Sequence, residues 1–469
     1  MNSYKKLVGN SFIFAIGNLG SKLISLILVP LYTHYLSTGE YGGVDLVMTT
    51  ASMFVPIVSA GIYEAVLRFI MDKNQSTDVI ISNSFFVSVI GCLIAFLFYP
   101  ILKYLGILGN NLLFLYFILL LIIFERVFSQ YARATNNIKI FSMNGMLLTL
   151  NTGILNILFL VYFELGVFGY FLSIIFAYVI SIVFLILTTK VYKEIRFSSL
   201  NLKLTKRLLN YSIPMVPNSL MWWVISASSR YFIFFFINSS ANGLFAIASR
   251  IPALINIVNQ VFTQAWQLSA IEEYENENKS KFYTNVFSYL SSIMFLGTSA
   301  IIAIVKVLFD FLFASEYYEA WRVVPFLLLG AVFSSFSGFF GTNYIAAKKT
   351  KGVFKTSVYG GITSMIFNLL LIPTLGIEGA GISSMASFFV MFVIRFFDTK
   401  QFIDIEINWR LFTSNVIIIF IQIGILMMQL ERVSETIIEA ILFIILLVTN
   451  RNLMTPIVEI IKSLKKRNK

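Results

Sequence analysis

The sequence predicts an all-α, polytopic membrane protein with about 14 transmembrane helices, and two observations carry this prediction. Of its 469 residues, 58% are hydrophobic and 12% are charged, whereas soluble proteins average roughly 45–50% and about 25%. Apolar segments of the ~20 residues that cross a hydrocarbon core recur along the whole chain. This composition excludes a soluble enzyme and a disordered chain, and the single cysteine, Cys92, excludes an internal disulfide.

Fourteen segments have the length and composition of a spanning helix. They lie at 11–36, 43–70, 79–99, 112–133, 141–163, 166–189, 208–237, 241–267, 283–305, 320–346, 352–373, 376–398, 411–430 and 434–452. Pro56, Pro214 and Pro217 fall inside two of the longer segments and predict kinks there. The connections are short, so we expect no soluble catalytic domain, no catalytic residues and no enzymatic activity. We also expect no metal site and no cofactor, because the chain has one His and one Cys.

Basic residues are unevenly divided between the two predicted sides of the membrane. With the N-terminus placed in the cytoplasm, the outer loops hold four of the 35 Lys and Arg residues and the spans hold four more. The outer four are Lys103, Lys306, Arg322 and Arg432. The remaining 27 lie on the cytoplasmic side or at its boundary, which predicts that both termini are cytoplasmic. The net charge of +12 is then mainly an orientation signal, and no nucleic-acid partner is expected.

An internal repeat organises the chain into two halves. Residues of the first half recur in the same order in the second, at offsets between 201 and 213 positions. The matched residues are Leu7, Ser11, Gly42, Tyr131, Ala134, Phe141, Leu165, Gly166, Gly169 and Ser173, which recur as Leu208, Ser212, Gly243, Tyr344, Ala347, Phe354, Leu375, Gly376, Gly379 and Ser383. Six helices per half give two parallel lobes around a central cleft, the plan of many transporters.

The predicted domains are therefore an N-terminal lobe (1–200), a C-terminal lobe (201–400) and a segment with two extra helices and a basic tail (401–469).

Three cations inside predicted spans are the first candidates for substrate binding. Lys22 lies near the middle of the first span, and Arg230 and Arg250 lie at similar depth in the seventh and eighth. Ionisable groups at such depth usually face a cavity or a partner, and Arg suits phosphate oxygens. The sequence shows no obvious acidic neighbour for either arginine, so we expect a cationic cleft for a phosphate-bearing substrate. The alternative is that Arg230 snorkels to the surface or pairs with a remote carboxylate.

Polar stripes add candidates for binding a hydroxyl-rich ligand. Asn18 shares one face of the first span with Lys22, and Asn256, Gln260 and Gln267 share one face of the eighth. Such residues also join helices in lipid, but a whole stripe favours a cavity.

Three residues of the second span are candidates for gating or ion coupling. Glu64 and Arg68 have the i, i+4 spacing of a helix salt bridge, which is the structural alternative to a gate. Asp45 is expected near the outer surface, in contact with water.

The opening of the chain resembles oligosaccharide repeat-unit flippases of the multidrug/oligosaccharidyl-lipid/polysaccharide exporter superfamily. The resemblance covers nearly the full length of the chain. It begins with KKLVGNSFIFAIGNLGSKLISLILVPLYTHYLSTGEYGGVDLV at 5–47, with Leu36, Tyr41 and Gly42 in the pattern Leu-x-x-x-x-[Tyr/Phe]-Gly. The Leu-Gly-[Val/Ile]-x-Gly turns at 165–169 and 375–379 are also similar to the superfamily.

This resemblance implies a function and partners. It implies movement of undecaprenyl-diphosphate-linked oligosaccharides from the inner to the outer leaflet of a bacterial cytoplasmic membrane, for capsule, exopolysaccharide or O-antigen assembly. The lipid bilayer and a lipid-linked glycan are the implied partners, with a polysaccharide polymerase and glycosyltransferases as further candidates. A lipid II flippase of peptidoglycan synthesis and a multidrug efflux antiporter are alternatives. A membrane glycan polymerase is disfavoured because no large loop is present.

Overall fold

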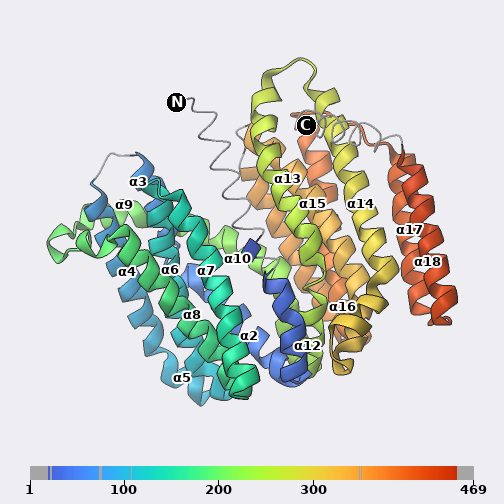
Figure 1. The fold of residues 1–469 in the computed structure, drawn as a ribbon. Coiled ribbons are helices and arrows are strands. Elements are labelled where there is room, and N and C mark those ends of the chain that lie inside the picture. Colours follow the sequence, from blue (N-terminus) through green and yellow to red (C-terminus); the bar gives the residue numbers. More distant parts are fainter. Residues whose placement is uncertain are drawn as a thin grey trace, which may run out of the picture. The chain divides into compact units, whose positions relative to one another are not determined.

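The computed structural model describes residues 20–21, 24–72, 76–106, 108–347, 349 and 351–451, without the side chains of residues 261, 264, 265, 268, 271, 272 and 275. These residues are all-helical, with no strand among them (Figure 1). They fall into two compact units. Unit 1 comprises residues up to Phe234 together with Asn238–Ala246, and unit 2 comprises Phe235–Ile237 together with the residues from Ile247 onward. The lobes expected at 1–200 and 201–400 stay a prediction.

Unit 1 contains the helices of the first half of the chain and three shorter ones that follow. They are Ile24–Tyr35, α2 (Thr38–Val58), α3 (Ile62–Asp72), α4 (Thr77–Leu97), α5 (Tyr99–Tyr104), α6 (Leu112–Ala134), α7 (Ile138–Asn156), α8 (Gly166–Thr189), α9 (Leu202–Ser212), α10 (Val216–Ala227), most of α11 (Ser229–Phe236) and most of α12 (Ser239–Ala248). The side chain of Ser37 caps α2 and the carboxylate of Glu40 bonds back to the Ser37 amide, a capping box.

Unit 2 contains the remaining helices. They are α13 (Pro252–Glu272), α14 (Lys279–Leu312), the 3₁₀ helix η7 (Ser315–Val323), α15 (Val324–Ala346), α16 (Lys351–Thr399), α17 (Trp409–Met427) and α18 (Arg432–Thr449). Its core is aromatic: the rings of Phe287, Phe336, Phe392 and Phe412 contact one another across α14, α15, α16 and α17. In Figure 1, α17 and α18 run side by side.

The turns at Gly166 and Gly376 adopt the same unusual backbone. Both glycines have φ near +60° (53° and 64°), a conformation that side chains disfavour. Three residues later, a Cβ on Gly169 would crowd the carbonyl of Phe159, and a Cβ on Gly379 would crowd the carbonyl of Leu371. The two Leu-Gly turns that the repeat analysis pairs therefore make the same close packing. Gly376 also divides α16 into the two helices expected at 352–373 and 376–398.

The expected span at 43–70 is two helices, not one. The backbone bonds from Gly61 to Pro56 and from Ala60 to Ile57, with Ala60 at φ 48°, form a Schellman turn that ends α2. The chain then starts again as α3 at Ile62.

The expected spans at 208–237 and 241–267 are also interrupted. Pro214 and Pro217 accompany a short 3₁₀ segment (Ile213–Met215) between α9 and α10, and a turn at 249–251 separates α12 from α13. Among the described residues, nine helices are long and apolar enough to cross a membrane, or ten if α12 and the start of α13 count as one span. The number fourteen stays a prediction.

Candidate functional site

Arg230 and Asp45 form an ion pair that the sequence did not reveal. Arg230 Nε on α11 lies 2.6 Å from Asp45 Oδ2 on α2, and the two side chains are 15% and 9% exposed. Arg230 also donates to the carbonyl of Ser226 at 3.3 Å and lies 5.6 Å from the ring centre of Phe245. The alternative that Arg230 pairs with a remote carboxylate is therefore confirmed, and the expectation of a hydrated Asp45 was wrong. The partner lies 185 residues away, and no local pattern identifies it.

Further bonds fix α2 against α10 and α11 next to this pair. The hydroxyl groups of Thr50 and Tyr231 are 2.6 Å apart, and the indole nitrogen of Trp223 donates to the carbonyl of Thr49 at 3.1 Å. Trp223 also packs edge-on against Tyr231. The ion pair thus belongs to a continuous polar and aromatic contact, and Trp223 is part of the packing.

Close backbone packing joins α2 to α12 in the same unit. A Cβ on Gly42 would overlap the carbonyl of Ser239, and a Cβ on Gly243 would overlap the carbonyl of Thr38. The hydroxyl of Ser239 donates to the Gly39 carbonyl at 2.7 Å, and the amide of Asn242 donates to the Gly42 carbonyl at 2.8 Å. Small residues here allow the helices to approach closely enough for side chains to reach backbone oxygens.

Glu64 and Arg68, whose spacing suits a helix salt bridge, do not form one among the described residues. Arg68 instead pairs with Asp72, Nε to Oδ2 at 3.3 Å, and both side chains are well exposed (60% and 36%). Exposed ion pairs contribute roughly 0–1 kcal/mol to the free energy of folding. Small differences in local geometry therefore decide which of two carboxylates an exposed arginine contacts. Arg68 therefore lies in a solvated pair, and its role in gating stays a prediction, as does that of Glu64.

The candidates on the eighth predicted span lie on α13 and just before it. Asn256, Gln260 and Gln267 are exposed, and Arg250 is half-buried in the turn between α12 and α13. Asn259, which the sequence analysis did not select, accepts a hydrogen bond from Ser335 of α15 at 2.6 Å. Lys22 and Asn18 lie outside the described residues, so the binding roles of all these candidates stay predictions.

Unit 2 holds buried charges that sequence reasoning missed. Lys306 was expected in an outer loop, but it lies within α14 and pairs with Glu435 of α18, Nζ to Oε2 at 2.7 Å. Glu439 and Arg395 are each 1% exposed. The partners of Lys306 and Arg395 come from other helices or from distant turns of the same helix, so they leave no pattern in the sequence.

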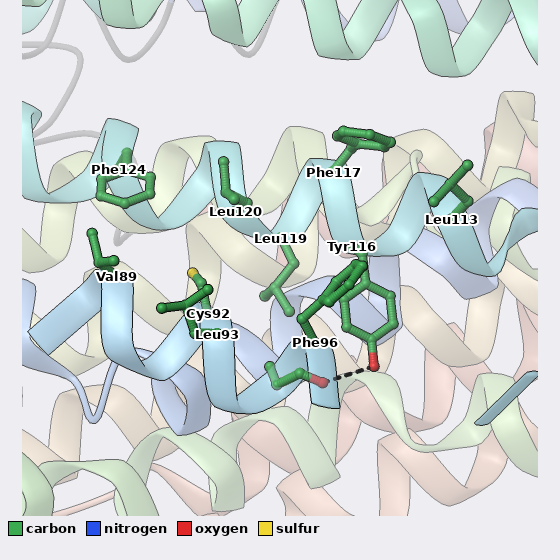
Figure 2. Close-up of a pocket in the computed structure, with 11 residues that line it drawn as sticks. Val89, Cys92, Leu93, Phe96, Leu113, Tyr116, Phe117, Leu119, Leu120 and Phe124 are labelled. Atoms are coloured by element: carbon green, nitrogen blue, oxygen red, sulfur yellow. Dashed lines mark hydrogen bonds between the residues drawn. The ribbon is translucent and has the colours of Figure 1, made fainter. Parts of the chain in front are cut away.

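Unit 1 also contains an apolar pocket between α4 and α6 (Figure 2). Its volume is about 340 Å³, and Cys92, Phe96, Phe117 and Leu120 are among its lining residues. The hydroxyl of Tyr116 is bonded to the Ala95 carbonyl at 3.0 Å. The described residues that line it carry no charge, so it suits hydrocarbon better than a phosphate or a sugar. Among the described residues, no group of three His, Cys, Asp or Glu side chains could hold a metal ion.

The fold is similar to the folds of several solved membrane transport proteins. It is similar to lipid II flippase MurJ in an inward closed conformation, with a TM-score of 0.71 and 14% identity over 95% of this chain and 100% of the other. It is also similar to the Vibrio cholerae MATE transporter VcmN, with a TM-score of 0.60 and 15% identity over 85% and 96%. An inward-facing multidrug resistance MATE transporter gives a TM-score of 0.67 and 15% identity over 81% and 95%.

Residues 7–267 match the polysaccharide biosynthesis protein family, and the chain belongs to this family. A relative from Methanocaldococcus jannaschii, named uncharacterized membrane protein MJ1068, is 26% identical over 172 residues. That match spans about a third of each chain (34%). The protein is thus a multi-pass membrane protein, and its fold and family are those expected from the Leu-Gly turns and the N-terminal motif.

Proposed function

We propose that this protein is a flippase that moves undecaprenyl-diphosphate-linked oligosaccharide repeat units from the inner to the outer leaflet of a bacterial cytoplasmic membrane. The observation that carries the proposal is the match of residues 7–267 to the polysaccharide biosynthesis protein family. We further propose that two lobes move to give alternating access to the substrate, and that both termini are cytoplasmic. Lys22 and Arg250 bind the diphosphate, and Asn18, Asn256, Gln260 and Gln267 bind the sugars.

The structure changes the role that we assign to Arg230. Its guanidinium is already neutralised by Asp45 at 2.6 Å, so we no longer assign it to the diphosphate. We assign Arg230 and Asp45 to a contact that holds α2 against α11. Breaking this contact would accompany a change of access, because a partly buried ion pair is easily re-solvated when helices separate.

Transport by the purified protein tests the proposal. The probe is a short undecaprenyl-diphosphate-linked oligosaccharide with a fluorophore on its glycan, reconstituted with the protein in liposomes. A membrane-impermeant reductant quenches the outer leaflet, and transport is read as the protein-dependent increase in quenching. We expect Arg250→Ala and Lys22→Ala to abolish transport with normal reconstitution, and Lys349→Ala, a lysine between α15 and α16, to retain it. Unchanged transport in both variants would refute the assigned diphosphate site.

A lipid II flippase is the second candidate, because the similarity to MurJ covers 95% of this chain and all of the other. Fluorescent lipid II in the same liposomes separates the two. Faster transport of lipid II than of the repeat unit would replace the first proposal with the second.

A further inference from the structure

A buried polar cluster lies where α18 packs on α14 and α17. Glu439 of α18 is 1% exposed, and Gln422 of α17 is 0% exposed. The Gln422 amide nitrogen donates to Glu439 Oε2 at 2.9 Å and to the carbonyl of Ser299, on α14, at 3.4 Å. Three helices therefore meet at one carboxyl group that bulk water does not reach.

The neighbouring cation is already neutralised. Lys306 Nζ lies 2.7 Å from Glu435 Oε2, donates to the carbonyl of Leu426 at 3.0 Å, and lies 4.3 Å from the ring centre of Trp321. Glu435 lies one helical turn before Glu439 on α18. Among the described residues, Lys306 thus pairs with Glu435 and forms no ion pair with Glu439.

Three buried oxygens of the cluster have no hydrogen-bond partner among the described residues. They are Glu439 Oε1, Gln422 Oε1 and Ser299 Oγ. An ionised carboxylate in this setting is strongly unfavourable, because one of its oxygens has lost water without gaining a donor. A protonated carboxyl group is neutral and adds an O–H donor to a cluster that has spare acceptors.

Near the first turn of α18, the other titratable or charged groups are Asp310 of α14, Arg432 of α18, and Tyr318 and Glu319 of η7. Arg410 lies at the start of α17, and Lys279, Lys281, Tyr283 and Tyr289 lie on the first three turns of α14. Arg432 pairs with Asp310. In the described part of the chain, Glu439 has Gln422 as its hydrogen-bond partner and forms no ion pair with any of these groups.

We propose that Glu439, held by Gln422, is a buried proton-binding site of the C-terminal helix pair α17–α18. The proton enters from water when the helix pair opens locally, and it keeps the cluster neutral, so that α17 and α18 pack stably on α14. Loss of the proton leaves a buried negative charge and loosens this packing. The site is independent of the transported substrate and of the flippase proposal.

Infrared spectroscopy of the full-length protein in lipid nanodiscs tests this site directly. The carbonyl stretch of a protonated carboxylic acid is resolved from the bands of a carboxylate, and it shifts on exchange into D₂O. We expect the wild-type band at neutral pH to decrease in Glu439→Gln, which has nearly the same shape and no proton to lose. The matched control, Glu431→Gln, removes an exposed carboxyl group from the start of the same helix and should leave the band unchanged. Gln422→Leu should keep the band but shift its frequency, because the hydrogen bond to Oε2 is lost.

Two results would overturn the proposal. An identical band in wild type and Glu439→Gln would show that Glu439 is ionised. Loss of the Glu439 band on addition of Na⁺ at constant pH would show that a sodium ion, and not a proton, is the ligand.

Discussion

Gly42 of α2 and Gly243 of α12 lie in backbone contact. A Cβ placed on Gly42 would come 2.8 Å from the Gly243 nitrogen, and one placed on Gly243 would come 3.2 Å from the Gly42 nitrogen. These two glycines occupy equivalent positions in the repeat found in the sequence. Equivalent helices of the two predicted halves therefore touch through equivalent residues, in the small-residue packing typical of membrane helices.

Adding a single methyl group at this contact should separate α2 from α12. We expect Gly42→Ala and Gly243→Ala to destabilise the protein by about 1–3 kcal/mol, the range for overpacking, seen as a lower apparent melting temperature in detergent. Gly43→Ala is the matched control, because its Cβ would have no neighbour nearer than 3.8 Å. Equal melting temperatures for Gly42→Ala and Gly43→Ala would contradict this packing.

The Asp45–Arg230 pair should show strong coupling between its two members. Asp45→Asn leaves a largely buried guanidinium without its counter-ion, and Arg230→Gln leaves the carboxylate without its own. We expect each single substitution to lower the free energy of unfolding by about 2 kcal/mol. The double variant should lose less than the sum of the two. Thermal unfolding of the four proteins measures the coupling. Strict additivity would mean that the pair does not stabilise the fold.

Arg68 should matter little for stability, in contrast to Arg230. Its partner Asp72 lies one turn further along α3, and both side chains contact solvent. We expect Arg68→Ala to change the free energy of unfolding by less than about 1 kcal/mol. A loss of stability as large as that of Arg230→Gln would show that the exposed pair has a structural role.

The hydropathy of the sequence predicts most helices of the fold, because burial in lipid demands long apolar segments. The expected span at 166–189 coincides with α8, Gly166–Thr189. The breaks are less predictable, because a Schellman turn at Ala60 depends on backbone torsions that an alanine does not signal. Proline marks the break between α9 and α10 but does not give its geometry.

The charged contacts were less predictable than the helices. Position along a span identifies Asp45 and Arg230 as unusual residues, but it does not reveal that they pair across 185 residues. Lys306 looked like a loop residue because the expected span ended at residue 305, whereas α14 continues through it and the mostly apolar residues that follow to Leu312. A helix that extends past its expected end can bring such a cation to Glu435, and this requires knowledge of α18.

Substitution of Arg395 tests whether the stability of unit 2 depends on the shape of a guanidinium group as well as on its positive charge. It is 1% exposed and donates to the hydroxyls of Thr356 and Ser357 and to two backbone carbonyls, those of Ser337 and Val353. A lysine ammonium is a single point and cannot span acceptors on both α15 and α16.

We therefore expect Arg395→Lys to lower the apparent melting temperature clearly, with a cost of about 1–3 kcal/mol for the acceptors left without donors. Arg410→Lys is the matched control, because Arg410 is exposed at the start of α17. Gly341→Ala should have a similar effect to Arg395→Lys, since its Cβ would come 2.7 Å from Arg395 Nη1 and displace the guanidinium. If Arg395→Lys melts like the control, positive charge alone holds α16 against α15 at this point, and the geometry of the four hydrogen bonds contributes little.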